Sequence, residues 1–289
     1  NPSLVGSEMC IRDRDSNFLK EFSVDFKDKV VLVTGGANGI GRALCQQFSR
    51  AGAKIAVVDL EGDAAIALAE TLGGLGLSAD VGCESDIQSA VLATENKLGP
   101  IDIFVSNAGV SFGDGPGWMA ASASNESWQT SWNVNVMSHV FAARAVVPGM
   151  IKRGGGYLVN VASGASLLCQ VGDAAYSTTK TAAVGFAESL AITHGDDNIA
   201  VSVVCPLYVK TRMTEDGRGV SGNDQVMSAD TAAEAILVGM SEKKFMILPH
   251  DELASYARRK GEDYEQWLRG MRMMRRGLIK QHPDYDYER

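Results

Sequence analysis

Residues Thr34–Gly41 read TGGANGIG and join a short apolar run, Val30–Thr34 (VVLVT), to a helix-length stretch that begins at Gly39. Glycines at such a junction let the backbone turn sharply and approach a pyrophosphate, whose charge is stabilised by amide N–H groups at a helix N-terminus. A tight turn without a ligand would also use glycine, but the position after the first apolar run favours a dinucleotide site. We therefore predict cofactor contacts at Gly35, Asn38, Gly39, Ile40 and Gly41.

Outward from this turn, short apolar runs alternate with longer amphipathic stretches. The runs are Val30–Thr34, Ile55–Asp59, Ile101–Ser106, Tyr157–Val161, Ala200–Cys205 and Phe245–Leu248, with a weaker one near Leu77–Asp80. The helix-length stretches are Gly39–Ala51, Asp63–Leu72, Ser85–Leu98, Ser127–Ile151, Ala174–Gly195 and Ala229–Ser241. Continuously apolar runs are typical of strands covered on both faces. The sequence therefore predicts an α/β fold, a single doubly wound Rossmann domain with a mainly parallel seven-stranded sheet.

We expect this domain to occupy residues 28–250, between an N-terminal segment, 1–27, and a helical C-terminal extension, 251–289. The first segment is expected to be disordered or non-native: residues 1–14 (NPSLVGSEMCIRDR) resemble translated adapter sequence, and a disordered natural tail is the alternative. The extension carries Trp267, Leu268, Met271, Met274 and Leu278 at roughly helical spacing. It could dock on its own or a neighbouring subunit, form a partial lid over the active site, or bind a membrane surface.

Composition excludes several classes of function. The 27 basic and 35 acidic side chains give a formal charge of −8, which argues against a nucleic-acid partner. The five cysteines form no Cys-x-x-Cys pair and the four histidines are scattered, so we expect no metal site and a reduced compartment. No apolar run approaches the roughly 18 residues of a membrane span. We expect a soluble, cytoplasmic protein with no membrane partner.

Asp59 ends the second apolar run, 18 residues beyond Gly41. A carboxylate there can accept hydrogen bonds from the adenosine ribose hydroxyls and would repel a 2′-phosphate. The neighbouring Leu60 supplies no cation, whereas Arg42 in the first helical turn could. We therefore predict that NAD is the cofactor, with NADP less favoured, and that Asp59 and Leu60 contact it.

Two Tyr-x-x-x-Lys pairs, Tyr176/Lys180 and Tyr256/Lys260, each place a phenol and an ammonium one helical turn apart. A nearby ammonium favours the phenolate and makes the tyrosine a usable general acid or base. Tyr176 follows Ser163 by 13 residues and comes after the fifth apolar run, whereas no hydroxyl residue stands at the same distance before Tyr256. We therefore predict that the first pair is catalytic and that the second lies on a solvated helix face.

Over residues 27–249 the chain resembles the short-chain dehydrogenase/reductase superfamily, in several places with consistent order and spacing. The matching positions are the TGGANGIG turn, Asp80-Val81, Asn107-Ala108-Gly109, Asn135, Ser163, Tyr176/Lys180 and Pro206–Thr211. The chain departs from the common family pattern at Ser106, where an asparagine is frequent, and at Leu207, where a glycine is frequent.

The resemblance implies a role for each matching position. Tyr176 would be the general acid/base and Ser163 would orient the reacting oxygen, while Lys180 would hold the nicotinamide ribose and depress the tyrosine pKa. Asn135 would position a water that relays protons. The implied cofactor contacts are Asp80 and Val81 at the adenine, Asn107, Ala108 and Gly109 beside the cofactor, Pro206, Val209 and Thr211 near the carboxamide, and Tyr176 and Lys180 themselves.

The segments after Gly109 and after Pro206 are glycine-rich and long, as lids over a ligand site are. An apolar substrate pocket is predicted at Phe112, Trp118, Leu168, Tyr208 and Met213, although ordinary packing under loops would also explain part of this set. We expect an NAD(P)-dependent enzyme that interconverts a secondary alcohol and a ketone on a small hydrophobic molecule. The resemblance further implies a homodimer or homotetramer. The alternatives are a catalytically silent dinucleotide-binding sensor or scaffold protein and, on the glycine-rich turn alone, a methyltransferase.

Overall fold

The computed structural model describes residues 25–115, 119–214 and 226–281. The expected N-terminal segment lies almost entirely outside these ranges. Phe26, which we expected to belong to that segment, is instead buried and packs edge-to-face on Phe48, with ring centroids 5.3 Å apart. The folded body therefore already includes Phe26.

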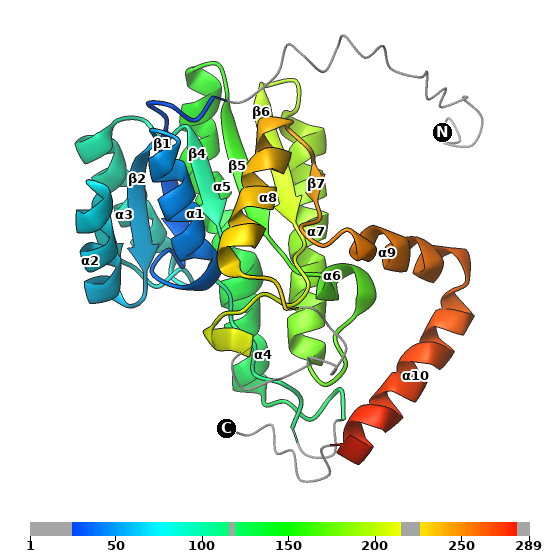
Figure 1. Cartoon of the computed structure of the whole chain (residues 1–289). Helices are drawn as coiled ribbons and strands as arrows, with labels where there is room; N and C mark the ends of the chain where they lie inside the picture. Colours follow the sequence, from blue (N-terminus) through cyan, green and yellow to red (C-terminus); the bar gives the residue numbers. More distant parts are fainter. Residues whose placement is uncertain (1–24, 116–118, 215–225, 282–289) are drawn as a thin grey trace, which may run out of the picture.

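A seven-stranded sheet forms the centre of the body (Figure 1), and every strand pair is parallel, as predicted. Its strands are β1 (Val30–Thr34), β2 (Lys54–Asp59), β3 (Leu75–Ser78), β4 (Ile103–Ser106), β5 (Gly156–Val161), β6 (Ile199–Val204) and β7 (Met246–Ile247). The spatial order is β3-β2-β1-β4-β5-β6-β7. Strand order reverses between β1 and β4, and in open α/β sheets ligands bind at the carboxyl ends of the strands beside this reversal.

Helices cover both faces of the sheet. They are α1 (Gly39–Arg50), α2 (Gly62–Leu72), α3 (Glu84–Leu98), α4 (Asn125–Trp132), α5 (Ser138–Lys152), α6 (Ala165–Leu168), α7 (Ala174–His194), α8 (Ala229–Ser241), α9 (Glu252–Glu262) and α10 (Tyr264–Gln281). The described residues also form a π-helical turn at Asn133–Met137 and a 3-10 turn at Arg212–Thr214.

Successive side chains of each strand enter two separate cores. In β1, Val30 and Leu32 pack with α3, α5 and α7, whereas Val31 and Val33 pack with α1, α2 and α8. Because each strand is buried on both faces, its residues are apolar throughout rather than alternately apolar and polar. This arrangement explains why the predicted strands lie within two residues of the observed ones.

One predicted helix is interrupted, and nothing in its sequence indicates the interruption. The stretch expected as one helix over Ser127–Ile151 is α4 and α5 joined by the π-helical turn Asn133–Met137. Over its most apolar window, the continuous helix Asn125–Lys152 has a mean hydropathy of 1.3 and is long enough to cross a membrane. Half of that window is buried inside the protein, as expected for a core helix of a folded domain.

Candidate active site

The turn between β1 and α1 is shaped for close approach of a ligand. Gly35 has φ +61°, and a Cβ built on it would lie 2.8 Å from Cα of Ala108. A Cβ on Gly41 would collide with the carbonyl oxygen of Gly35, so α1 can begin this close to the turn only with glycine there. Asn38, the N-cap residue of α1, makes no capping hydrogen bond with its side chain. The Asn38 side chain therefore leaves the first backbone N–H groups of α1 uncapped. A helix that binds a pyrophosphate at its N-terminus needs these N–H groups for the ligand.

Asn107 holds this turn from the neighbouring strand. Its Nδ2 donates to the carbonyl oxygens of Thr34 and Gly35, both at 3.0 Å. Thr34 Oγ1 in turn accepts the N–H groups of Asn107 at 3.1 Å and Ala108 at 3.3 Å. We expected Asn107 to contact the cofactor. It lines a large cavity at the carboxyl ends of the strands, and it also braces the glycine turn.

The carboxylate of Asp59 is fixed at the end of β2. Its Oδ2 accepts the N–H of Ala37 at 2.9 Å and its Oδ1 accepts the N–H of Glu61 at 3.1 Å. This places an oriented anion at the rim of the same cavity, in the position that adenosine ribose hydroxyls require. Arg42, the cation that sequence reasoning named as a possible partner for a 2′-phosphate, is exposed on α1 and does not line the cavity.

A different cation reaches the adenosine end. Arg212 Nη1 forms an ion pair with Glu61 Oε1 at 2.8 Å, across 151 residues of sequence. Asn38 Nδ2 also donates to Glu61, at 3.4 Å. The Arg212 guanidinium lowers the pKa of Glu61 from its ordinary value, because it stabilises the carboxylate. The pair links the segment after β6 to the segment after β2, over the glycine turn, and neither partner stood out in the sequence.

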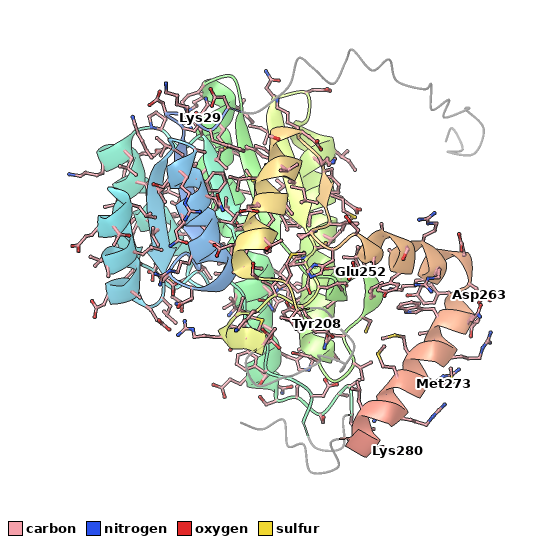
Figure 2. All side chains as sticks on the ribbon, in the orientation of Figure 1. Lys29, Tyr208, Glu252, Asp263, Met273 and Lys280 are labelled. Carbon is pink, nitrogen blue, oxygen red and sulfur yellow. The ribbon has the colours of Figure 1, made fainter. Side chains whose placement is uncertain are left out.

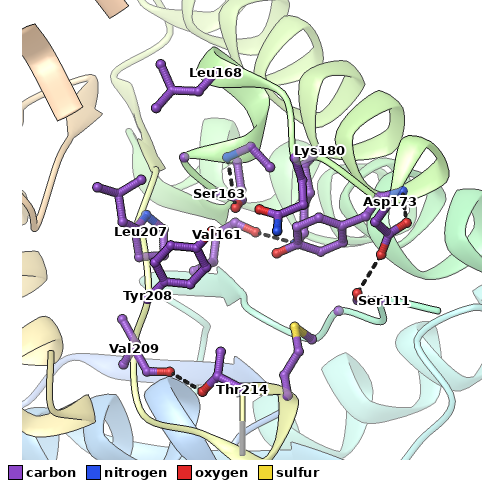
Figure 3. Close-up of a pocket in the computed structure, with 18 of the residues that line it drawn as sticks. Ser111, Val161, Ser163, Leu168, Asp173, Lys180, Leu207, Tyr208, Val209 and Thr214 are labelled. Atoms are coloured by element: carbon purple, nitrogen blue, oxygen red, sulfur yellow. Dashed lines mark hydrogen bonds between the residues drawn. The ribbon is translucent and has the colours of Figure 1, made fainter. Parts of the chain in front are cut away.

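One continuous cavity of about 1230 Å³ opens at the carboxyl ends of the strands and contains most of the predicted site. Its lining includes the predicted cofactor residues Gly35, Asn38, Gly39, Ile40, Asp59, Leu60, Asp80, Val81, Asn107, Ala108, Gly109, Pro206, Val209 and Thr211. Ser163, Tyr176 and Lys180 line the same cavity, as do Leu168, Tyr208 and Met213 from the predicted substrate pocket. Figure 3 shows how several of these side chains converge.

The reactive side chains come from the end of β5 and the first turns of α7. Ser163 is the second residue after the end of β5, and its Oγ accepts the N–H of Ala165 at 3.1 Å. Lys180 Nζ donates to the carbonyl oxygen of Val161 at 2.9 Å (Figure 3) and lies 5.7 Å from the centre of the Tyr176 ring. Lys180 is almost fully buried, at 3% exposure, and is therefore held in one place.

The protonation of this group differs from the expectation. We expected Lys180 to lower the pKa of Tyr176, but burial raises the pKa of the phenol to about 12, against a smaller lowering by its hydrogen bond with Ser163. Burial also lowers the pKa of Lys180 to about 8. Both changes have the same cause, since a low-dielectric site disfavours the charged form of either group. Without a further charge, the site therefore holds a neutral phenol at neutral pH.

Asn135 lies beside this group but does not reach the cavity. Its Oδ1 accepts the N–H of Val110 at 2.9 Å, and its Nδ2 donates to the Val110 carbonyl at 2.9 Å and to Thr179 Oγ1 at 3.1 Å. All the hydrogen-bonding groups of the side chain except one lone pair are thus in use. The expected role of holding a relay water with the side chain does not match this arrangement, in which Asn135 ties the segment after β4 to α7.

Asp173 belongs to the site and was missed. It is the N-cap of α7, with Oδ1 accepting the N–H of Tyr176 at 3.0 Å. Its Oδ2 accepts the Ser111 hydroxyl at 2.6 Å and the N–H of Gly113 at 3.1 Å (Figure 3). An aspartate three residues before the tyrosine is a helix-start signal that could have revealed it. Asp173 joins α7 to the segment that follows β4.

Two of the predicted substrate residues need comment. Phe112 does not line the cavity: it is 36% exposed, while its neighbours Ser111 and Gly113 face the cavity. Ser111 and Gly113 are both held by Asp173, so the residue between them is directed away from the cavity. Trp118 lies outside the described residues.

His250 supports the segment at which the chain departs from the family pattern. Its Nδ1 accepts the N–H of Leu207 at 3.2 Å, and the ring is 4% exposed. The Leu207 side chain lies so close to Gly164 that a Cβ there would be 2.5 Å from Leu207 Cδ2. The leucine thus fills space beside the turn that follows Ser163.

The second Tyr/Lys pair was wrongly assigned to a solvated helix face. Tyr256 is half-buried, lines the cavity and stacks under the Arg259 guanidinium, 4.9 Å from its ring centre. Lys260 Nζ donates to the carbonyl oxygen of Leu167 at 2.6 Å. The pair therefore attaches α9 to α6 beside the cavity, and the C-terminal extension forms part of the cavity wall.

Within the described ranges, no group of three His, Cys, Asp or Glu side chains is placed to hold a metal ion.

The comparisons with known proteins agree with this geometry. The sequence profile described as short chain dehydrogenase matches residues 29–219. The chain belongs to this family. It is 37% identical over 193 residues to a probable galactose dehydrogenase of Rhizobium meliloti, which covers 65% of this chain and 74% of that protein. It is 36% identical over 203 residues to D-threitol dehydrogenase of Mycolicibacterium smegmatis, covering 67% and 76% of the two chains.

A solved short-chain dehydrogenase from Burkholderia phymatum, in complex with NAD, has a similar fold, with a TM-score of 0.74 and 24% sequence identity over 84% of this chain and 96% of that one. As a short-chain dehydrogenase, the chain is an oxidoreductase of alcohol and ketone groups that binds a nicotinamide dinucleotide. The observed turn suits such a cofactor, because Gly35 and Gly41 allow the backbone to pack more tightly at the N-terminus of α1 than any side chain would permit.

Proposed function

We propose that this short-chain dehydrogenase interconverts a hydrophobic secondary alcohol and its ketone, using NAD in preference to NADP and Tyr176 as general acid/base. The observation that carries the proposal is the shared cavity, in which Ser163, Tyr176 and Lys180 face the same space as the glycine turn and Asp59. A reacting group bound there would be in reach of both the phenol and the dinucleotide.

Each side chain has a part in the chemistry. Ser163 lies close enough to Tyr176 to lower the pKa of the phenol, so the two hydroxyls can hold one substrate oxygen between them. In the direction of reduction, the neutral phenol of Tyr176 donates its proton to the ketone oxygen; in oxidation, the phenolate takes the alcohol proton. When bound, the dinucleotide supplies or accepts hydride and, in its oxidised form, brings a positive charge to the site.

The groups around Tyr176 determine the pH at which it donates or accepts a proton. Lys180 is the nearest cation, and its ammonium stabilises the phenolate that forms when the ketone is reduced. The raised pKa of Tyr176 favours the proton-donating role at neutral pH. Ketone reduction is therefore expected to proceed at neutral pH, and alcohol oxidation to need higher pH.

The preference for NAD is supported by Asp59. Both of its carboxylate oxygens are oriented by backbone N–H groups, and a 2′-phosphate beside them would bring two anions together. Arg212 is a cation beside the adenosine end of the cavity. It is already paired with Glu61, which makes it a weaker partner for a 2′-phosphate.

The test is NADH formation, followed by its absorbance, across a panel of secondary alcohols, with NADP measured in parallel. The proposal expects turnover of hydrophobic alcohols with a higher kcat/KM for NAD than for NADP. Dinucleotide binding without turnover of any alcohol or ketone on the panel would instead support the sensor or scaffold alternative. Turnover restricted to small polyols would contradict the hydrophobic substrate, and a higher kcat/KM for NADP would contradict the cofactor preference.

A further inference from the structure

The C-terminal extension forms an arm that leaves the body after β7 (Figure 1). Its first helix, α9, is anchored by the fully buried Leu253 and by the hydrogen bond from Lys260 to α6. The chain then turns at Asp263, whose Oδ1 accepts the N–H of Gln266 at 2.8 Å and so caps α10. Glu252, Asp263 and Lys280 mark the start, the corner and the last turn of this arm in Figure 2.

One face of α10 is apolar and lines the cavity. Trp267, Met271, Met274 and Leu278 recur at intervals of four, three and four residues, which places them on one side of a helix. All four line the cavity that also contains Ser163 and Tyr176. The opposite side carries Arg269, Arg272, Met273, Arg276 and Lys280, and Met273 is 61% exposed.

The outer end of α10 reaches back toward the segment after β4. Arg275 on α10 is close enough to Asp114 to lower its pKa, against a larger raising by burial. Asp114 Oδ1 accepts the N–H of Ala174 at the start of α7. The arm therefore stands across the cavity, with α9 on one side and the Asp114 segment on the other.

The cavity is too large for a single small ligand. Pockets for one drug-sized molecule measure about 300–1000 Å³, and this one measures about 1230 Å³. The glycine turn and Asp59 belong to β1, α1 and β2, whereas the α10 face belongs to the arm beyond β7 (Figure 1), and Ser163 and Tyr176 line the same cavity. A ligand at Tyr176 can therefore extend toward α10 while the dinucleotide occupies its own part.

We infer that the apolar face of α10 binds the hydrocarbon body of the substrate, which is an extended, uncharged alcohol or ketone whose reacting carbon lies at Tyr176. The inference rests on the proposed function and names its substrate class. Burying Met271, Met274 and Trp267 against hydrocarbon removes apolar surface from water, and the flexible methionines can adapt to its shape. A polyol would leave this face hydrated and gain nothing from it. Among the charged residues that α9 and the corner before α10 contribute to the lining, Glu252, Glu262 and Asp263 outnumber Arg259, which disfavours a substrate with an anionic head.

The test compares Met271→Asp, on the apolar face, with Met273→Asp, on the exposed face, as a matched control. Substrates are the alkan-2-ols from butan-2-ol to dodecan-2-ol. In the wild type and in Met273→Asp, kcat/KM should rise along this series, by up to about fourfold for each added methylene that reaches α10. Met271→Asp should lower the ratio of kcat/KM for dodecan-2-ol to that for butan-2-ol by about tenfold or more.

Binding is measured separately from turnover, by quenching of Trp267 fluorescence with dodecan-2-one, and Trp267→Phe identifies the part of the signal that comes from Trp267. The wild type and Met273→Asp should bind the ketone, and Met271→Asp should bind it at least about tenfold more weakly. Ketone binding of this pattern with no turnover would refute the proposed function and support the α10 site. Equal affinity and equal chain-length dependence in the two aspartate variants would overturn the inference. Loss of self-association in Met271→Asp with unchanged ketone affinity would also overturn it, because a second copy would then cover this face.

Discussion

Asp173 Oδ1 accepts the backbone N–H of Tyr176 at 3.0 Å, so the carboxylate that caps α7 also fixes the backbone of the residue that we propose as the general acid/base. Through Oδ2 the same carboxylate holds Ser111 and Gly113. One side chain, which is 5% exposed, therefore contributes both to the position of Tyr176 and to the shape of the segment after β4.

Replacing Asp173 should separate its charge from its hydrogen bonds. Its negative charge raises the pKa of Tyr176. Asp173→Asn keeps an acceptor for the Tyr176 N–H but removes the charge, so the Tyr176 limb of the kcat/KM against pH profile should move to lower pH. Asp173→Ala should in addition destabilise the protein by about 1 kcal/mol through loss of the N-cap. A limb that stays in place or moves to higher pH in the asparagine variant would contradict the assignment of that limb to Tyr176.

The Glu61–Arg212 pair should influence cofactor choice. Glu61→Ala removes the carboxylate that engages Arg212 at 2.8 Å and leaves a guanidinium beside the adenosine end. The ratio of kcat/KM for NADP to that for NAD should rise on the order of tenfold, the size of one hydrogen bond to a charged group. Adding Arg212→Gln to this variant should cancel the rise. If the ratio rises equally with and without Arg212, then the cation is not responsible.

His139 should make stability depend on pH. Its ring is fully buried, and burial lowers its pKa to about 3 from an ordinary value of 6.5, with Lys180 adding to the lowering. Above pH 6.5 the ring is neutral in both the folded and unfolded protein. Below it the unfolded chain takes up a proton that the native state does not, so the free energy of unfolding falls as pH drops toward 3, by at most about 1.4 kcal/mol per pH unit.

Urea unfolding at a series of pH values should therefore show a shallower acid-side loss in His139→Gln than in the wild type. His194→Gln serves as the control, because His194 is only partly buried and pairs with Asp197. Identical slopes in the His139 variant and the wild type would show that the buried ring is not the group that titrates.

The fold was predictable from local pattern because the strands are apolar on both faces. Continuously apolar runs such as Ile55–Asp59 and Tyr157–Val161 are typical of strands in a parallel sheet that is covered on both faces. The glycine turn and Asp59 were predictable for the same reason, since both follow strands whose ends must share one edge of the sheet.

The rest depends on contacts between segments far apart in sequence. Nothing local indicates that Arg212 meets Glu61, or that α9 is turned so that Tyr256 faces the cavity. The π-helical turn that directs Asn135 onto Val110 also has no local signature. The pKa of Tyr176 could not be inferred from the spacing of Tyr176 and Lys180 alone, because burial of the phenol has the largest effect on that pKa.

Tyr176 is the residue on which the proposed chemistry depends most. The most direct measurement is kcat of Tyr176→Phe for reduction of a hydrophobic ketone with NADH, alongside the NADH dissociation constant from fluorescence. Loss of the phenol hydroxyl should lower kcat by about a thousandfold, as expected when a general acid is removed, and should leave NADH affinity largely unchanged. A variant that binds NADH normally and retains near-wild-type kcat would contradict the assignment of Tyr176 as the acid/base.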